Sequence, residues 1–251
     1  KIAAELSLKV EQIQSWEIIR KGIDARRKPR VLRVYTVDLV VAEEVAVDLE
    51  QEHHPRLSRV DTAVTPERVK NIDKSVRALV VGMGPAGLFS ALQLAEAGAE
   101  VTLVERGKPV AERLKQVRNH WAGGPLDPEN NVQFGEGGAG TFSDGKLTSR
   151  LNHPLMRKVL ETLVRFGAPA EILFQAKPHV GSDRLRGVLI NFRRELECLG
   201  VDIRFSTKLS GFNIHNEQVI AGILNDTEEL SCDALILAPG HSARDTYRLL
   251  D

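Results

Sequence analysis

Three glycines spaced as Gly-x-Gly-x-x-Gly mark the part of the chain best suited to chemistry. Gly82, Gly84 and Gly87 follow a short apolar run and open a stretch of helical periodicity. At this spacing the first glycine permits a tight turn, the second lets the backbone approach a diphosphate, and the third lets the helix pack closely on the strand. The exposed N–H groups of the turn, which includes Pro85 and Ala86, favour a bound anion. The motif predicts a dinucleotide-binding turn.

A carboxylate follows where a ribose acceptor is needed. Glu105 ends the second apolar run, 18 residues after Gly87. It could accept hydrogen bonds from both ribose hydroxyls of an adenosine and would repel a 2′-phosphate. We expect the adenosine end of a dinucleotide at this residue. The alternative is an ordinary turn between strand and helix with a solvated glutamate.

A second glycine-rich loop, FGEGGAGTFSDGKL, runs from Phe134 to Leu147. So many glycines lose much conformational entropy on folding, which favours a loop that approaches a ligand. Its amides and hydroxyls could bind a second phosphate and a ribityl chain, and its lysine could place a positive charge beside a reduced flavin. The candidate cofactor-binding residues here are Gly137, Gly138, Ala139, Gly140, Thr141, Ser143 and Lys146. The alternative is a flexible surface hairpin that turns at Asp144-Gly145, with a solvated lysine.

The first motif serves NAD and FAD alike, and two features favour FAD. The run Glu105-Arg106-Gly107, together with Pro85, resembles the first motif of the glutathione-reductase-like FAD fold, which adds Arg106 to the candidate residues. The second glycine-rich loop would have no purpose in a plain NAD-binding dehydrogenase, which is the competing interpretation.

The surrounding pattern predicts an α/β fold. A strand at 78–81, a helix at 86–97 and a strand at 101–104 form a βαβ unit. The pattern further predicts a helix from Pro154 to Gly167, a helix capped by Asp183 that runs to Leu199, strands at 201–205, 209–214 and 218–224, and a buried parallel strand at 234–238. We therefore expect a Rossmann-like domain with a parallel sheet and an inserted β-meander.

A small α/β domain is expected before this one. Residues 3–20 have a helical pattern, and residues 31–41 form a β-branched run typical of a strand. The polar stretch 64–77 is typical of a linker, with the boundary near residue 72. The predicted domains are thus 1–72, small and α/β with the linker, and 73–251, Rossmann-like and incomplete at its C-terminus. Because the chain starts at Lys1 and stops soon after an apparent strand, we expect a fragment.

Composition excludes several classes of protein. Lysine plus arginine equal aspartate plus glutamate at 34 each, so no overall field would attract a nucleic acid. No apolar run approaches the roughly 20 residues that span a bilayer, and the N-terminus lacks the apolar core of a signal peptide. Cys198 and Cys232 are far apart, which favours a reducing, cytoplasmic setting. His53-His54 has no second ligand pair at a convincing spacing, so no metal site is expected.

Most of the chain resembles a largely uncharacterised bacterial family of FAD-dependent dehydrogenases. The resemblance rests on residues 78–147, KPHVGSDRLRGVL (177–189), ALILAPGHSARDT (234–246) and, for the family's small N-terminal domain, residues 22–39. It implies FAD extended from Glu105 at the adenosine end to the second loop at the flavin end. It also implies that Arg113 lies near the diphosphate or adenosine, and that Ala238-Pro239-Gly240 is the return-strand motif that passes the cofactor. The family's C-terminal half, which completes the cofactor and substrate sites, is missing from this sequence.

The function expected from these features is an FAD-dependent oxidoreductase that passes hydride through flavin to a small-molecule substrate, with NAD(P)H as a possible electron donor. No catalytic acid or base can be named, and the cysteine pair of a disulfide reductase is missing. His241 and Arg244 could contact substrate or flavin, or form a helix-entry turn in which Asp245 pairs with Arg244. Two alternatives stay open: a flavin-dependent RNA-modifying enzyme, suggested by the basic cluster Arg26-Arg27-Lys28, and a non-enzymatic flavoprotein with a structural or regulatory role.

Overall fold

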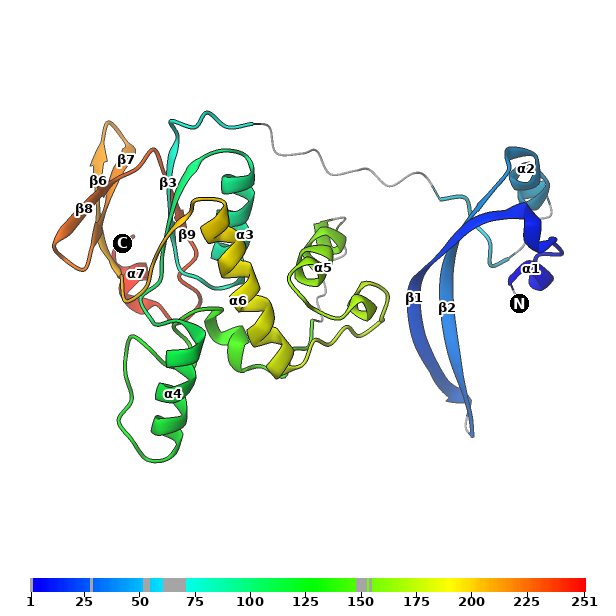
Figure 1. Ribbon diagram of the computed structural model, residues 1–251, viewed down its shortest axis with the longest axis horizontal. Coiled ribbons are helices and arrows are strands. Elements are labelled where there is room, and N and C mark those ends of the chain that lie inside the picture. Colours follow the sequence, from blue (N-terminus) through cyan, green and yellow to red (C-terminus); the bar gives the residue numbers. More distant parts are fainter. Residues whose placement is uncertain (1, 28, 52–54, 61–70, 148–152, 154) are drawn as a thin grey trace. The chain divides into compact units, whose positions relative to one another are not determined.

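A computed structural model of the chain describes residues 2–27, 29–51, 55–60, 71–147, 153 and 155–251. The helices and strands (Figure 1) are, in chain order, α1 Ile2–Glu5, η1 Val10–Gln12, β1 Ile13–Arg27, β2 Arg30–Val41, α2 Glu43–Gln51, β3 Arg77–Val81, α3 Pro85–Glu96, β4 Glu100–Val104, α4 Val110–Trp121, η2 Gly138–Phe142, α5 Leu155–Arg165, η3 Ala170–Leu173, α6 Ser182–Cys198, β5 Asp202–Arg204, β6 Leu209–His215, β7 Gln218–Leu224, β8 Glu228–Ser231, β9 Ala234–Leu237 and α7 Arg244–Arg248. His53-His54, Lys28 and residues 64–70 of the expected linker lie outside the described residues.

The chain forms two compact units. The first combines 1–67, 147–164 and 169–179, and the second combines 68–146, 165–168 and 180–251. The division at residue 72 that the sequence suggested stays a prediction.

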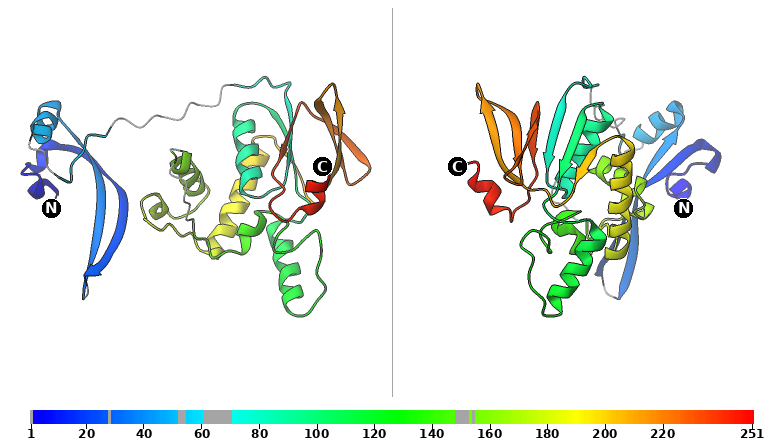
Figure 2. Two further views of the ribbon diagram at one scale, coloured as in Figure 1. Left: turned by 180° about the vertical axis from the view of Figure 1, so that it is seen from behind. Right: turned by 60° about the vertical axis from the view of Figure 1, so that its left-hand side comes forward.

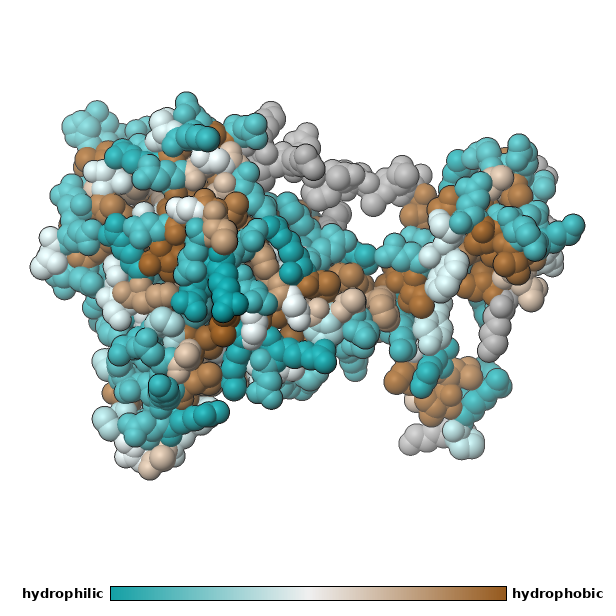
Figure 3. Space-filling model, in the orientation of Figure 1, coloured by the Kyte–Doolittle hydropathy of each residue, from teal (hydrophilic) through white to brown (hydrophobic). Residues whose placement is uncertain are grey.

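The first unit is built on an antiparallel pair of strands. β1 and β2 pair from Ile13↔Val41 to Arg27↔Arg30. The strand expected at 31–41 is confirmed, but the helix expected over 3–20 is wrong beyond the short α1. The β-branched residues of β1 also fit a strand, and the ladder with β2 supplies hydrogen bonds that outweigh a weak helical periodicity. Hydrophobic side chains such as Trp16, Ile23 and Val31 remain exposed on these strands. Figure 3 shows hydrophobic residues, in brown, on the surface of this unit.

The second unit contains the expected parallel sheet. Its strand order is β5-β4-β3-β9, and all three neighbouring pairs are parallel. The βαβ unit of β3, α3 and β4 is confirmed, with bounds within a residue of those expected. β9 is parallel as expected, but its side chains are only partly buried, because it is the edge strand of this sheet among the described residues.

The sheet is covered on both faces. α3 packs on β3, β4 and β9 and contacts α6, while the antiparallel meander β6-β7-β8 lies on the other side (Figure 2). Between sheet and meander is a core that includes Leu79, Val104, Leu209 and Leu224. This confirms the Rossmann-like domain with an inserted meander, of which β8 was not foreseen.

Two smaller expectations need comment. α5 starts at Leu155, as predicted within a residue, although Pro154 itself lies outside the described residues. α6 has Gly181 as its N-cap, without a side-chain cap, so Asp183 is not the cap. Asp183 instead lies in the first turn, within 3.4 Å of Arg186. Within the described residues, no helix is long and apolar enough to cross a membrane.

Candidate dinucleotide-binding site

The first and third glycines of the motif are required by the protein's own packing. Gly82 has φ +100°, and a Cβ there would lie 2.3 Å from the carbonyl oxygen of Ala238. A Cβ on Gly87 would lie 1.8 Å from the carbonyl oxygen of Gly82. No side chain fits at such distances, so these two glycines bring β3, α3 and the return strand together.

Gly84 is different, because no atom of the described residues crowds it. The nearest atom to an added Cβ would be the Cα of Gly138 at 3.9 Å, and the residue has a negative φ of −77°. Gly84 is the N-cap of α3 without a side-chain cap, and Pro85 follows at the first helical positions. The remaining N–H groups of the first turn have no partner inside the helix, which makes this end of α3 suitable for an anion.

The second glycine-rich loop lies against the first. The amide of Gly137 donates to the carbonyl oxygen of Met83 at 2.8 Å. A Cβ on Gly138, which has φ +61°, would stand 3.1 Å from the Cα of Gly84. Gly137 has φ +82°, and a Cβ there would meet the hydroxyl of Thr141 at 2.3 Å. The loop therefore needs glycine to fold tightly against the motif, and it is not an independent surface hairpin.

Glu105 joins the two loops and is 5% exposed. Its Oε2 accepts from the amide of Met83 at 2.8 Å, and its Oε1 accepts from those of Gly107 at 2.9 Å and Gly135 at 2.8 Å. A carboxylate has about four acceptor positions. Three are in use, which leaves space for about one ribose hydroxyl rather than the two expected.

These parts enclose a cleft of about 590 Å³, a size typical of ligand sites. It lies at the carboxyl ends of β3, β4 and β9, where open α/β sheets bind ligands. The sequence-predicted residues that line it are Gly82, Gly84, Pro85, Ala86, Glu105, Arg106, Gly138, Ala139, Gly140, Ala238 and Gly240. The other candidates do not line it: Gly87, Arg113, Gly137, Thr141, Ser143 and Lys146.

Arg106 stands at the wall of the cleft with its charge neutralised. Its Nε lies 2.8 Å from a carboxylate oxygen of Glu129, and its Nη1 donates to Asp245 at 3.1 Å. The guanidinium carbon is also 4.5 Å from the centroid of the Phe134 ring. Asp245 thus pairs with Arg106. The helix-entry alternative had required a pair with Arg244. The pKa of Asp245 is lowered by this pairing, mainly because the carboxylate accepts a hydrogen bond from Arg106.

Three polar residues of the second loop face away from the cleft. The hydroxyl of Thr141 is fully buried and donates to the carbonyl oxygen of Glu136 at 2.8 Å. The hydroxyl of Ser143 accepts from the amide of Gly145 at 3.1 Å. Lys146 pairs with Asp144 at 2.7 Å on the surface. None of the three lines the cleft, and their expected role in binding phosphate, ribityl chain or flavin stays a prediction.

Arg113, which was expected near the FAD diphosphate or adenosine, does not line the cleft. It is fully buried behind the second loop, and its Nη1 donates to the carbonyl oxygen of Glu136 at 2.7 Å. Burial lowers its pKa to about 10, an effect that the charges of Glu105 and Glu136 partly offset. It contacts the loop rather than the cleft.

Several lining residues were not foreseen. They are Gln133, Phe134, the run Thr207, Lys208 and Leu209, and, after the return strand, Ser242, Ala243, Thr246 and Tyr247. Thr207 follows β5, and its amide donates to the carbonyl oxygen of Glu105 at 2.9 Å. The carboxyl end of a parallel strand was the signal that could have identified it. Of the two uncertain residues, His241 lines the cleft and Arg244 does not.

Comparisons with known proteins agree with this architecture. Residues 76–248 match the family described as pyridine nucleotide-disulphide oxidoreductase, and residues 1–40 match a domain of unknown function, DUF8436. A protein of Clostridium beijerinckii, described as an uncharacterized protein, is 39% identical over 259 residues, which cover 100% of this chain and 47% of the relative. The chain thus spans about half the length of the curated relative it matches.

Solved structures resemble the chain more distantly. THI4 of Thermovibrio ammonificans is 16% identical over 69% of this chain and 60% of its own, with a TM-score of 0.45. An FAD-dependent pyridine nucleotide-disulphide oxidoreductase from Desulfovibrio vulgaris is 18% identical over 68% of this chain and 27% of its own, with a TM-score of 0.31. The family match covers well over half of the residues, including both glycine-rich loops and the whole cleft. The chain therefore belongs to the pyridine nucleotide-disulphide oxidoreductase family.

Proposed function

We propose that this chain is the FAD-binding part of a flavin-dependent oxidoreductase and that the cleft holds FAD. The observation that carries the proposal is the meeting of two glycine-rich loops at the start of α3, in one cleft with Glu105. The narrower family assignment, to bacterial FAD-dependent dehydrogenases, rests on the motifs of the sequence and forms part of the proposal.

The residues present suit FAD. Gly84 and Gly138 form a cradle that a larger side chain would fill, and the uncapped first turn of α3 offers donors to a diphosphate. Glu105 offers its remaining acceptor position to a ribose hydroxyl. Ala139, Gly140 and Gly240 line the cleft without bulky side chains, which suits the backbone's close approach to a flexible chain and a ring.

When bound, FAD would supply two-electron chemistry through its flavin ring. The chain's own part is to bind and orient. Glu105 fixes the spacing of the loops around Met83, Gly107 and Gly135 through hydrogen bonds. Arg106, already paired with Glu129 and Asp245, closes the wall near Phe134 instead of supplying a free positive charge.

We propose that NAD(P)H or another donor reduces the flavin and that a small molecule is the substrate. The described residues supply no cysteine pair for disulfide reduction. Cys198 is exposed on α6, whereas Cys232 is buried and burial raises the pKa of its thiol. Both cysteines are free, which favours a reducing, cytoplasmic setting for the protein.

The test is the visible absorption spectrum of the full-length protein as purified. We expect flavin absorption, and FAD should be the nucleotide identified by chromatography after heat release. A colourless protein that cannot be reconstituted with FAD, yet binds NAD, would refute the proposal. If the protein holds FAD, the rates at which NADH and NADPH reduce its flavin under anaerobic conditions, followed by the loss of visible absorption, would identify the electron donor.

A further inference from the structure

Arg113 makes an unusual set of contacts for an arginine of a surface helix. It projects from α4, is fully buried, and donates through Nε to the carbonyl oxygen of Asn131 at 2.8 Å. Its Nη1 donates to the carbonyl oxygens of Glu136 at 2.7 Å and Gly135 at 3.3 Å, and to the hydroxyl of Thr141 at 3.0 Å. Every one of these acceptors belongs to the second glycine-rich loop or to the segment that leads into it.

The loop is shaped around this side chain. A Cβ on Gly135, which has φ +114°, would lie 2.5 Å from Cδ of Arg113. The guanidinium carbon lies 4.9 Å from the centroid of the Phe142 ring. Only Nη2 lacks a hydrogen-bond partner among the described residues. A buried charge is costly unless acceptors converge on it, so the arginine and the conformation of the loop depend on each other.

The same peptide groups fasten the loop to the first motif. The peptide group between Glu136 and Gly137 makes two of these bonds. Its carbonyl oxygen accepts from Arg113, and its N–H donates to the carbonyl oxygen of Met83 at 2.8 Å. The peptide group between Gly135 and Glu136 likewise accepts from Arg113 through its carbonyl oxygen. Its N–H donates to the carbonyl oxygen of Lys108 at 3.1 Å. Hydrogen bonds in such chains polarise one another. A chain of bonds therefore runs from Arg113 through the second loop to the first.

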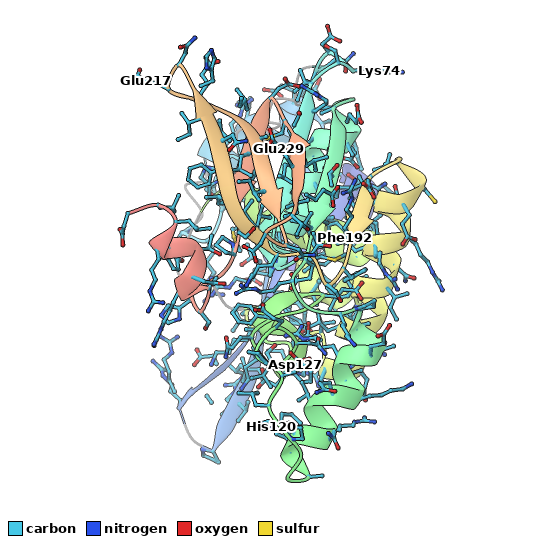
Figure 4. The ribbon with its side chains drawn as sticks, turned by 90° about the vertical axis from the view of Figure 1, so that its left-hand side faces the viewer. Lys74, His120, Asp127, Phe192, Glu217 and Glu229 are labelled. Carbon is cyan, nitrogen blue, oxygen red and sulfur yellow. The ribbon has the colours of Figure 1, made fainter. Side chains whose placement is uncertain are left out.

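The segment before the loop is ordered too. Asp127, in the loop after α4 (Figure 4), accepts through Oδ1 from the amides of Glu129 at 2.9 Å and Asn130 at 3.1 Å. Asn131 donates through its side chain to the carbonyl oxygen of Asp127 at 2.8 Å. The carbonyl group of Asn131 is thereby held where Nε of Arg113 meets it.

We propose that Arg113 is a positioning residue: through these peptide groups it sets the spacing of the two glycine-rich loops that would bracket the FAD diphosphate, without touching the cofactor. The inference deepens the proposed function and rests on it. This role also explains why Arg113 is buried behind the loop and does not present its charge to the cleft.

The test compares Arg113→Met, Arg113→Lys and Thr141→Val in the full-length protein. Arg118→Met is the matched control, because Arg118 is an exposed residue of the same helix. Hydrogen exchange in peptides that contain the amides of Glu136 and Gly137 is measured on flavin-free protein, and the FAD dissociation constant is measured by flavin fluorescence. We expect Arg113→Met to speed exchange of these amides and weaken FAD binding by on the order of 10- to 100-fold.

The gentler variants keep the test meaningful if Arg113→Met fails to fold. Thr141→Val has nearly the same shape but loses both the bond from the guanidinium and the bond that the hydroxyl donates to Glu136, so its effects should be roughly tenfold. Arg113→Lys keeps the charge but reaches fewer carbonyl groups, and it should fall between wild type and Arg113→Met. Exchange in β3 and β4 should not change in either variant, and Arg118→Met should match wild type.

The outcomes separate the two proposals. Loop exchange and FAD dissociation that rise together across the variants would support the positioning role. Unchanged loop exchange, or loosened loops with unchanged FAD binding, would refute the role of Arg113 alone. A wild-type protein that binds no FAD would refute the proposed function, and with it any cofactor-positioning role, whatever the exchange rates show.

Discussion

Replacing Gly84 with alanine should weaken FAD binding while leaving the fold intact. The added Cβ would lie 3.9 Å from the Cα of Gly138, which is ordinary van der Waals contact. The backbone conformation of Gly84, with φ −77° and ψ −177°, is one that any residue can adopt. A ligand held between the two loops, by contrast, would be crowded by the new methyl group.

The structure sets the expected changes in the free energy of unfolding and in the affinity for FAD. Alanine is a poorer N-cap than glycine by about 1 kcal/mol, and the loss of backbone freedom in the unfolded chain offsets roughly 0.4–1 kcal/mol. The free energy of unfolding should therefore change little. For the ligand, one extra methyl group in a close-packed site costs about 1–3 kcal/mol. That is roughly a 5- to 150-fold increase in the FAD dissociation constant.

Two measurements on the flavin-free protein and its FAD complex check this. Urea unfolding of the flavin-free variant should match wild type, and fluorescence titration should show the weaker FAD binding. Gly187→Ala is the control, because it makes the same change on α6, where an added Cβ meets no atom within 4 Å in the described part of the chain. Wild-type FAD affinity in Gly84→Ala would refute the argument that the diphosphate lies between the two loops.

Three further outcomes follow from the same geometry. Gly87→Ala should destabilise or unfold the flavin-free protein, seen by urea titration, because its Cβ would lie 1.8 Å from the carbonyl oxygen of Gly82; a stable variant would contradict the packing described. Gly187→Ala should raise the free energy of unfolding by roughly 0.5–1 kcal/mol, since it replaces an uncrowded glycine inside a helix; a loss of stability would exclude this environment. Asp245→Asn should lower the free energy of unfolding by up to about 1 kcal/mol at pH 7, since its partly exposed carboxylate pairs with Arg106. Because that pairing holds the pKa of Asp245 below its ordinary 3.8, the difference should persist above pH 3.8 and vanish as the pH falls through the lowered pKa; urea titrations across this range that show no such trend would exclude the pairing.

The sequence was sufficient wherever a local pattern fixes a local shape. The strand, glycine turn and helix at 77–96 were predicted within a residue, because each glycine has one physical task at one spacing. The distance of Glu105 along the chain from the motif drew attention to a residue that lines the cleft, and its role as ribose acceptor stays a prediction. Local pattern failed over residues 3–20, where pairing with β2 decided in favour of a strand.

What only the tertiary structure decided is the direction of polar side chains in and around the second loop. Read along the chain, Thr141 and Arg113 are equally able to face a ligand or the interior. They lie 28 residues apart, and each turns inward because the other and the carbonyl oxygen of Glu136 are there to meet it. The sequence by itself thus determined that a dinucleotide-binding turn exists and where it begins, since its glycines act on neighbouring atoms. Which residues face the ligand and which hold the loops behind it depends on packing between distant segments, and only the folded chain brings these together.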